Sequence, residues 1–486
     1  MNQKFRSIIG LGFILLSFCL FSCKDEPSSK PDKPNILLIL IDDLGYSAIT
    51  PYGNPYQEMP ALEKLREQGM LFTDAYVTPQ CTPTRASLLT GQHTARNGMW
   101  HVTPGYSFPF ARMQEPEYRK NLPIETYTLA EALKDQGYTT ACLGKWHLNT
   151  WESGIGYYTY LWDSAKHHHG FDYVNPVTDP QNYHQRGDKG VEFLTNEAIK
   201  FMEQNQEQPF FIYLSQHTIH GPVLAPDTLV EKYKDRGWPY QYQNIRKINY
   251  PTNATYLAAL EHINNSISRL MQSLEDMNLK ENTLVIFLSD NGGVDNEFEN
   301  YPLRYGKGSN YEGGIRVPFI ASWPGTIPAN STEHTPVHVT DFYPTLLDLA
   351  GGKMPENHAI DGVSLKSLLL QKDTLDRNTL YWYTPLYDIQ WGATPSAIIR
   401  EGDYKLIHFF GDHIDLEDSS RYITEPKTVL YNLADDMSET QDLSQEMPEL
   451  TRRLEINLLH WIDSMGAELP TLNPKYNPDS AFYRPR

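Results

Sequence analysis

The sequence NILLILIDD, residues 35–43, contains an unbroken apolar run followed by two aspartates. A run of this kind, without the polar alternation of a half-exposed strand, is typical of a strand buried on both faces of a parallel sheet. The sequence TLVIFLSDNGG, residues 283–293, repeats the pattern and ends in Asp290 and Asn291. We therefore predict two buried strands of one α/β sheet, each ending in polar side chains.

Helical and strand patterns alternate along the chain between these two runs. This alternation predicts an open α/β sheet with helices on both of its faces. The expected helices cover residues 61–68, 128–136 and 256–277, and further expected strands cover 139–143 and 210–214.

The pattern changes after about residue 375. Short strands separated by turns, followed by one amphipathic helix over residues 448–465, predict a small antiparallel sheet with a helix packed on it. We therefore expect a main α/β domain over residues 34–375 and an α+β subdomain over 376–486. The expected strands of the subdomain are 397–400, 404–408 and 429–432.

Residues 1–22 have the layout of a secretory signal peptide, with basic residues before a short apolar stretch. The segment Leu20–Cys23 resembles the lipobox of bacterial lipoproteins, so we expect Cys23 to be lipidated and residues 23–33 to form a polar tether. Simple cleavage is the alternative. The charged residues after Cys23 resemble the surface-export signal of Bacteroidetes lipoproteins. We therefore expect an exported protein, periplasmic or on the outer-membrane surface of a Bacteroidetes-like bacterium, that contacts the membrane only through its lipid.

The chain carries a formal net charge of −19 at pH 7. A protein of this charge has no general attraction for nucleic acid or for anionic membrane surfaces. We therefore expect no nucleic-acid partner. An anionic substrate would have to be held by a local cluster of cations.

Asp42, Asp43, Asp290 and Asn291 follow the two buried strands directly. Ligands of open α/β sheets bind beyond the carboxyl ends of the strands, where these four side chains could meet. Oxygen ligands with three negative charges suit calcium or magnesium, and calcium tolerates irregular geometry better. The alternative is that both segments are ordinary turns.

The sequence CTPTRASLLTG, residues 81–91, reads as a short helix with Thr82 as the cap, Pro83 in the first turn and Gly91 at the end. Cys81 would then lie at the helix N-terminus, where we expect a lowered thiol pKa. Arg85 would add positive charge. A disulfide with Cys142 is the alternative for Cys81, and otherwise Cys142 is expected to be a buried free thiol.

The segment 81–91 also resembles the signature of type I, formylglycine-dependent sulfatases of the alkaline phosphatase superfamily. In that family the cysteine is oxidised to formylglycine (3-oxoalanine). Other segments are similar to sulfatase motifs in the family's order, over residues 34–465, and resemble Bacteroidetes glycan sulfatases. These are GKWHL at 144–148, QHTIH at 216–220, GKGSNYEGGIRVP at 306–318, DFYP at 341–344, DG at 361–362, IR at 399–400, DYKL at 403–406 and LYNL at 430–433.

The resemblance implies a large mixed sheet between helices, and a sulfuric ester hydrolase that works through a formylglycine sulfoenzyme intermediate. It implies a formylglycine-generating or anaerobic sulfatase-maturing enzyme as a partner. Lys145 and Lys307 would neutralise the sulfate oxygens, His220 with Lys307 would protonate the leaving alcohol, and His147 would accept the proton that releases sulfate. The resemblance further implies that Arg85 orients the modified residue and that calcium is bound by Asp42, Asp43, Asp290, Asn291 and the modified Cys81.

The substrate is expected to be a sulfated carbohydrate, of glycosaminoglycan, mucin or algal origin. One alternative is a phosphodiesterase or phosphonate monoester hydrolase of the same superfamily, and another is a non-catalytic glycan-binding lipoprotein. The run His167–His169 is expected to be a loop and not a metal site. Aromatic and charged residues in irregular stretches are candidates for substrate binding: Trp100, His101, His169, Asp172, Arg304, Trp382 and Trp391.

Overall fold

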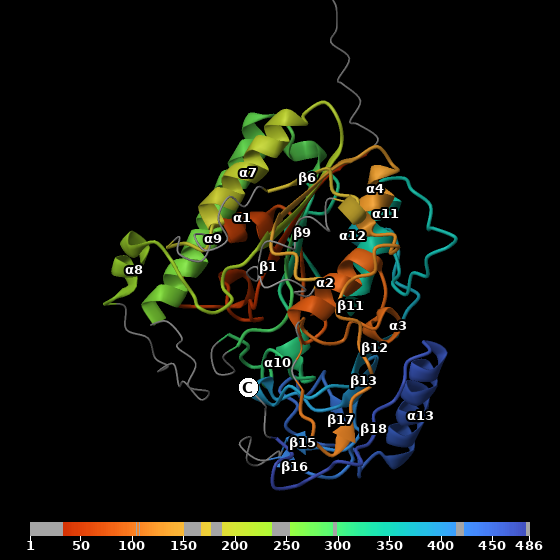
Figure 1. Ribbon diagram of the computed structural model, residues 1–486. Coiled ribbons are helices and arrows are strands. Elements are labelled where there is room, and N and C mark those ends of the chain that lie inside the picture. The colour runs from red at the N-terminus through yellow and green to blue at the C-terminus, as the bar shows by residue number, and fades with distance from the viewer. Residues whose placement is uncertain are drawn as a thin grey trace, which may run out of the picture. The chain divides into compact units, whose positions relative to one another are not determined.

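The computed structural model describes residues 33–103, 105, 107–149, 167–175, 187–235, 253–294, 299–414 and 422–482. Its centre is an eight-stranded sheet with the strand order β10-β2-β9-β8-β1-β7-β5-β6 (Figure 1). The strands are β1 (Asn35–Ile41), β2 (Met70–Phe72), β5 (Thr139–Gly144), β6 (Tyr173–Val174), β7 (Phe210–Gln216), β8 (Thr283–Ser289), β9 (Phe319–Ser322) and β10 (Ser331–Glu333).

Strand β1 lies in the middle of the sheet and pairs in parallel with β7 on one side and β8 on the other. Its last residue, Ile41, is opposite Gln216 of β7 and Ser289 of β8. The three strands therefore end at the same level, and the polar residues that follow them meet at one edge. Strand β9 pairs antiparallel with β8 and β2, so the sheet is mixed, as expected.

Helices cover both faces of this sheet (Figure 1). Because successive side chains of a strand point to opposite faces, Leu38 and Leu40 of β1 belong to one core cluster and Leu37 and Ile39 to the other. The first core includes residues of α2 (Cys81–Thr90), α4 (Leu129–Lys134), α11 (Phe342–Leu349) and α12 (Lys366–Leu369). The second includes residues of α1 (Pro60–Glu67), α7 (Val191–Gln204), α8 (Asp227–Tyr233) and α9 (Asn253–Asp276).

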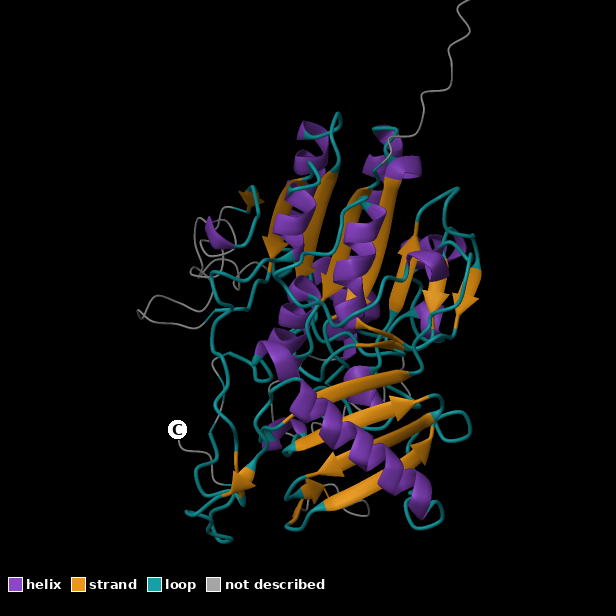
Figure 2. Cartoon of the chain, turned by 90° about the vertical axis from the view of Figure 1, so that its right-hand side faces the viewer, coloured by secondary structure: helices purple, strands orange, loops and turns teal. Residues whose placement is uncertain are grey.

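A separate four-stranded antiparallel sheet follows, with the order β12-β13-β14-β17. Helix α13 (Pro448–Ser464) lies across it, and Leu454 and Leu458 pack against Ile399 and Leu406 in one core (Figure 2). The strands are β12 (Thr379–Thr384), β13 (Ser396–Glu401), β14 (Tyr404–Phe409) and β17 (Lys427–Asn432).

Buried charges join the two sheets. Lys405 of β14 is fully buried between Glu312, at 2.9 Å, and Glu439, at 2.8 Å. Glu312 belongs to α10 (Glu312–Ile315), which follows the large sheet's β8 in the chain. A buried cation between two buried carboxylates therefore ties the small sheet to the main one.

Short elements complete the described chain. They are the helices α3 (Thr94–Asn97), η1 (Thr50–Tyr52), η2 (Lys280–Asn282), η3 (Val339–Asp341) and η4 (Ile389–Trp391), and the strands β3 (Ala75–Tyr76), β4 (Met113–Gln114), β11 (Val337–His338), β15 (His413–Ile414), β16 (Tyr422–Ile423) and β18 (Thr471–Leu472).

The predicted fold class is confirmed, and each expected helix and strand occurs with bounds shifted by a few residues. The signal peptide at 1–22, Cys23 and the tether up to residue 32 lie outside the described residues. Within the described ranges, no helix combines the length and apolar character needed to cross a membrane.

Candidate active site

The site lies where β1 and β8 end beside the first residue of α2. The backbone N–H of Asp290 donates to the carbonyl of Ile41 at 3.1 Å, and that of Asp43 donates to the Asp290 carboxylate at 3.1 Å. As a result, one ligand atom each of Asp42, Asp43, Asp290 and Cys81 lies within 4.8 Å of the others. All four residues are buried. The structure thus brings together residues that are far apart in the sequence.

Each of the three carboxylates has its own cation. Lys145 Nζ lies 2.7 Å from Asp42 Oδ2, and Arg85 Nη2 lies 2.6 Å from Asp290 Oδ2. Burial alone would raise the pKa of Asp42, but Lys145 and its neighbours bring it well below its usual value. The charges at the centre of the site are therefore held in pairs.

Lys307 pairs with the third carboxylate. Its Nζ lies 2.6 and 2.8 Å from the two oxygens of Asp43 and 3.5 Å from Cys81 Sγ. Although burial works against the charge, the carboxylates hold the pKa of Lys307 well above its usual value. A permanent ammonium group thus stands directly beside the side chain of residue 81.

The donor set fits a divalent cation with oxygen ligands. Asp42 Oδ1 and Asn291 Oδ1 are buried and accept no hydrogen bond from the described residues. Burial and the nearby Asp42 raise the pKa of Asp290 to about 7, so the cations of the protein do not fully compensate the three carboxylates. Carboxylate and amide oxygens are the ligands that calcium and magnesium take. The cluster could therefore hold such an ion.

Helix α2 begins at Cys81, with Gln80 as its N-cap residue, and Gly91 ends it with a φ of 67°. The predicted cap at Thr82 is therefore wrong by two positions, whereas the predicted end is confirmed. The expected lowered pKa of Cys81 is also wrong, because burial raises it to about 12 despite Lys145 and Lys307. As an unmodified thiol, this residue would be a weak nucleophile at neutral pH.

Cys81 and Cys142 are both buried and free, so the disulfide alternative is not what the structure adopts. Cys142 lies within β5 and belongs to the apolar core, as predicted. Cys81 is therefore the thiol that faces the charged cluster.

Hydrogen bonds to backbone carbonyls fix the tautomers of two site histidines. His147 Nε2 lies 2.8 Å from the carbonyl oxygen of Thr103, and His220 Nδ1 lies 2.8 Å from that of Gly221. A carbonyl only accepts, so these nitrogens carry the protons, and His147 Nδ1 and His220 Nε2 are the basic ones. His220 Nε2 lies 3.9 Å from Asp43 Oδ2.

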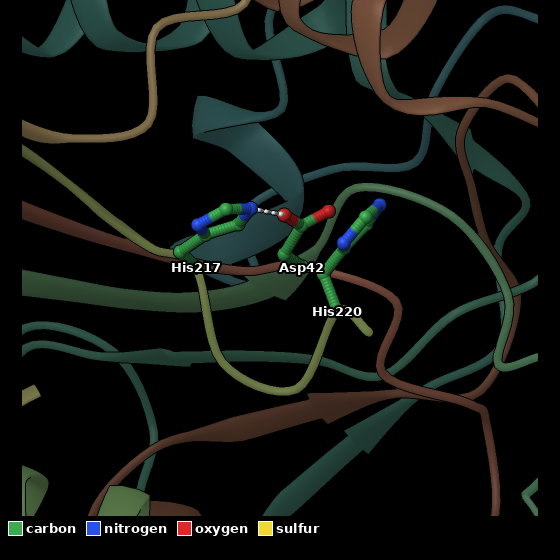
Figure 3. Close-up of side chains that lie close together, drawn as sticks. All are labelled: Asp42, His217 and His220. Carbon is green, nitrogen blue, oxygen red and sulfur yellow. Dashed lines mark ion pairs between the residues drawn. The ribbon is translucent and has the colours of Figure 1, made fainter. Parts of the chain in front are cut away.

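Two further residues belong to this neighbourhood. His217 Nε2 lies 3.6 Å from Asp42 Oδ2, and Figure 3 shows the rings of His217 and His220 on either side of that carboxylate. Lys189 is fully buried and donates from Nζ to the backbone carbonyl of His220. Neither His217 nor Lys189 is among the predicted site residues. The segment QHTIH offered a signal for His217, but Lys189 stands in no recognised motif.

Among the substrate-binding candidates, Trp391 lies beside Lys307 of the charged cluster. Its ring centroid is 5.5 Å from Lys307 Nζ, and a Cβ on Gly308 would come within 2.2 Å of its Cβ. The turn that carries Trp391 is anchored by Asp388, which accepts a 2.7 Å hydrogen bond from Gln80, the residue before Cys81. The small sheet's connecting loop therefore forms part of the wall around residue 81.

The other candidates are placed less favourably. Asp172 pairs with Lys134 and accepts from Thr140 N–H, near the start of β5, whereas Lys145 follows the end of that strand. This placement argues against a substrate-binding role for Asp172. His169 is buried against Trp146.

Four more candidates are committed to packing within the protein. Trp382 is buried and donates to the carbonyl of Val77, Trp100 packs on Tyr383, and His101 is buried beside Tyr118. Arg304 stacks on Tyr311 and donates to the carbonyl of Glu439. Their placement gives no support to direct contact with substrate.

All three residues of the histidine run are described: His167 and His168 are exposed and helical, so the expected loop is wrong there, and His169 is buried. Within the described ranges, the clusters suited to a metal ion are both at Asp42, and neither includes this run.

Comparison with known proteins identifies the family and agrees with the architecture. The sulfatase family model matches residues 34–352, and the model for the C-terminal part of N-sulphoglucosamine sulphohydrolase matches residues 303–458. A sulfatase of Formosa agariphila is 31% identical, with 95% of this chain and 94% of that protein covered. Human arylsulfatase A is 32% identical, with 84% and 83% covered.

A solved structure is also similar. The crystal structure of Ps i-CgsB in complex with k-i-k-neocarrahexaose has a TM-score of 0.69 and 25% identity, with 91% of this chain and 94% of that chain covered.

Fold and site together define a hydrolase of the alkaline-phosphatase-like class. The chain belongs to the sulfatase family, and it is a sulfuric ester hydrolase.

Proposed function

We propose that this protein removes sulfate from a sulfated carbohydrate, with Cys81 converted to formylglycine and calcium as the metal. The observation that carries the proposal is the position of the Cys81 side chain, within 4.8 Å of three carboxylates and 3.5 Å from Lys307 Nζ. An unmodified thiol with a raised pKa is poorly suited to attack sulfur, whereas a hydrated aldehyde at residue 81 supplies hydroxyl groups for that attack.

Asp42, Asp43, Asp290 and Asn291 would hold calcium, together with residue 81. The ion would supply positive charge to a sulfate oxygen. Support comes from the buried Asp42 Oδ1 and Asn291 Oδ1, which accept no hydrogen bond from the described residues.

Lys145 and Lys307 would neutralise the charge on the sulfate oxygens. Both are buried, paired and fixed in place, so little reorganisation is needed when charge develops in the transition state. Arg85, with its donors divided between Asp290 and the carbonyl of Lys145, would hold the first turn of α2 against the metal-binding carboxylates.

His147 and His220 would handle protons. His220 Nε2 lies 3.9 Å from Asp43 Oδ2 and carries no proton in the tautomer that the Gly221 hydrogen bond fixes, and burial and Lys307 lower the pKa of His220 to about 3. His220 with Lys307 would protonate the leaving alcohol, with the Lys307 ammonium as the source of the proton and His220 Nε2 as its relay. His147 Nδ1 is the acceptor nitrogen of its ring, and it would take the proton from the modified residue when sulfate is released.

A carbohydrate substrate is supported by the complex of Ps i-CgsB with neocarrahexaose and by Trp391, an aromatic side chain at the edge of the cation cluster. Cleavage of a signal peptide at 1–22, lipidation of Cys23 and export to the periplasm or outer surface remain part of the proposal. So do a maturation enzyme as partner and a catalytic domain that ends near residue 375. The support for export is the sequence of the N-terminal segment.

The proposal is tested in two steps. Protein from its native host is digested with trypsin, and the peptide that contains residue 81 is expected to be lighter than the cysteine form. An unchanged mass in all growth conditions would contradict the enzyme mechanism and leave a non-catalytic glycan-binding protein.

The matured protein is then assayed on sulfated mono- and disaccharides and on an aryl sulfate with its matching aryl phosphodiester. Faster turnover of the phosphodiester would favour the related phosphodiesterase activity. Release of sulfate from the saccharides is the expected result.

A further inference from the structure

A second pocket lies at the seam between the two sheets. It is open to solvent and has a volume of about 320 Å³. Its walls come from the loop after α2, from Asp361, from the start of β12 with the two residues before it, and from the end of α13. The residues that matter for its chemistry are His93, Asp361, Arg377, Tyr381, Trp461 and Met465.

This pocket is separate from the catalytic cluster. Helix α2 has ten residues, Cys81–Thr90, so its two ends lie about 15 Å apart, and His93 follows the end opposite to Cys81. Strand β12 also separates the two sites. Thr379 at its start lines the pocket, whereas Thr384 at its other end donates a hydrogen bond to Asn310, three residues after Lys307.

One wall of the pocket is aromatic. The rings of Tyr381 and Trp461 are parallel within 6°, with centroids 4.7 Å apart, and His93 meets the Trp461 ring edge-on at 5.3 Å. All three side chains are only partly buried. Tyr381 and Trp461 cover one face of each other, so the pocket meets the ring surface that this stack leaves exposed, which is apolar.

The polar groups of the pocket are balanced in charge. Asp361 accepts from Arg96 Nε at 2.9 and 3.0 Å and from the backbone N–H of His93 at 3.0 Å. Arg377 donates to both oxygens of Asp341, at 2.6 and 2.7 Å. Two guanidinium groups and two carboxylates therefore cancel, and the pocket offers donors and acceptors without a net charge.

The aromatic wall and the balanced charges together favour a neutral ligand over an anionic one. A sulfate group needs surplus positive charge, which the cluster around residue 81 would have with a divalent cation bound and which the paired guanidinium groups of this pocket do not supply. A neutral sugar ring has an apolar face that packs on aromatic rings and hydroxyl groups that bond to carboxylate and guanidinium edges. A volume of about 320 Å³ is at the small end for a ligand pocket and suits one or two sugar rings.

We propose that this pocket is a second carbohydrate-binding site, which holds an unsulfated sugar unit of the glycan whose sulfate is removed at residue 81. The inference rests on the proposed carbohydrate substrate. A glycan held at both places is presented to the catalytic cluster at a raised effective concentration. The site would then raise the affinity for long substrates and leave the chemistry at residue 81 unchanged.

The test uses the full mature protein and two neutral probes, neoagarohexaose and an unsulfated N-acetyllactosamine tetrasaccharide, titrated by calorimetry or NMR. We expect saturable binding of at least one probe, weakened at least tenfold by Trp461→Ala. Because Trp461 also packs on the small sheet's core, Asn378→Trp serves as a second variant, which fills the pocket from an exposed position. Trp323→Ala, on the main sheet, is the matched control and should bind normally.

Rates of sulfate ester hydrolysis distinguish a failure of this inference from a failure of the proposed function. Both pocket variants should retain aryl sulfate turnover and raise KM about tenfold for a long sulfated oligosaccharide, with kcat unchanged. Failure of both probes to bind, or binding that survives both variants, would overturn the second site while leaving sulfatase activity intact. Absence of sulfate release with neutral-probe binding retained would instead count against the proposed function alone.

Discussion

Lys307 offers the sharpest test of how the site works. Its ammonium group is buried and lies 2.6 and 2.8 Å from Asp43 and 3.5 Å from the side-chain sulfur of Cys81. The substitution Lys307→Met keeps most of the side-chain volume and removes the charge. It leaves Asp43 without this partner and takes positive charge from the place where the substrate's sulfate would bind.

The size of the effect is estimated by taking the 3.5 Å between Lys307 Nζ and Cys81 Sγ as the distance from the ammonium to the charge of the bound ester. Two unit charges 3.5 Å apart interact by about 332/(20 × 3.5), roughly 5 kcal/mol, at the effective dielectric constant that describes protein sites best. That is an upper bound, since the substrate also has Lys145 and a metal nearby. Loss of a single preorganised donor typically costs about 10²–10³ in rate. We therefore expect kcat/KM to fall by about 10³.

The assay is aryl sulfate hydrolysis, with each rate divided by the fraction of residue 81 that mass spectrometry finds modified. Lys307→Arg should keep part of the activity because it retains the charge in a different shape. Lys366→Met, which removes a half-exposed lysine paired with Asp348, is the matched control and should be near wild type. A loss of less than tenfold at equal modification would refute the assignment of Lys307 to charge stabilisation.

Four other predictions address positioning, stability, its pH dependence and the metal. Lys189→Met, which removes the hydrogen bond to the His220 carbonyl, should slow sulfates with poor leaving groups about tenfold more than nitrophenyl sulfate; equal losses would contradict a link to proton delivery. Lys405→Met should lower the free energy of unfolding by about 3–5 kcal/mol, because it takes the cation away from buried Glu439 and leaves Glu312 with Arg316 alone as an ion-pair partner. Burial raises the pKa of Glu439 to about 7, so the folded state keeps this proton while the unfolded chain has lost it, and the residue makes stability fall as pH rises towards 7. Glu439→Gln should flatten that decline in urea unfolding measured from pH 5 to pH 8. Finally, calcium at about 100 times its Kd should add about 2.7 kcal/mol of stability that EDTA removes, and an unchanged melting temperature would count against a calcium site.

The features that the sequence predicted well depend on local pattern. The apolar run at 35–41 dictates a buried strand, and the polar residues at its end must lie at the sheet's edge whatever the rest of the chain does. Gly91 ends α2 because the left-handed backbone there favours glycine. Such features need only the residues beside them, so one sequence suffices to find them.

The features that the sequence missed depend on distant parts of the chain. A helix N-terminus predicts a lowered thiol pKa for Cys81, but the cores packed around it remove water and reverse the shift. Asp172 is near motif residues in sequence, yet the length of β5 separates it from Lys145. Lys189 reaches the site because the turn just before α7 brings its Nζ to the backbone carbonyl of His220. Burial and strand length decide these cases, and neither can be read from spacing.

The charge of the site explains how a protein of net charge −19 could capture an anion. Asp42, Asp43 and Asp290 are matched by Arg85, Lys145 and Lys307, so the formal charge of these six side chains is zero. With only paired charges, the cluster has little surplus to attract a sulfate ester. A divalent cation bound to Asp42 Oδ1 and Asn291 Oδ1, which accept no hydrogen bond from the described residues, would add two positive charges. This exceeds the single negative charge of the ester. Affinity for the substrate should therefore depend on the metal more strongly than the stability of the fold does, because the pairs hold the site together in either case.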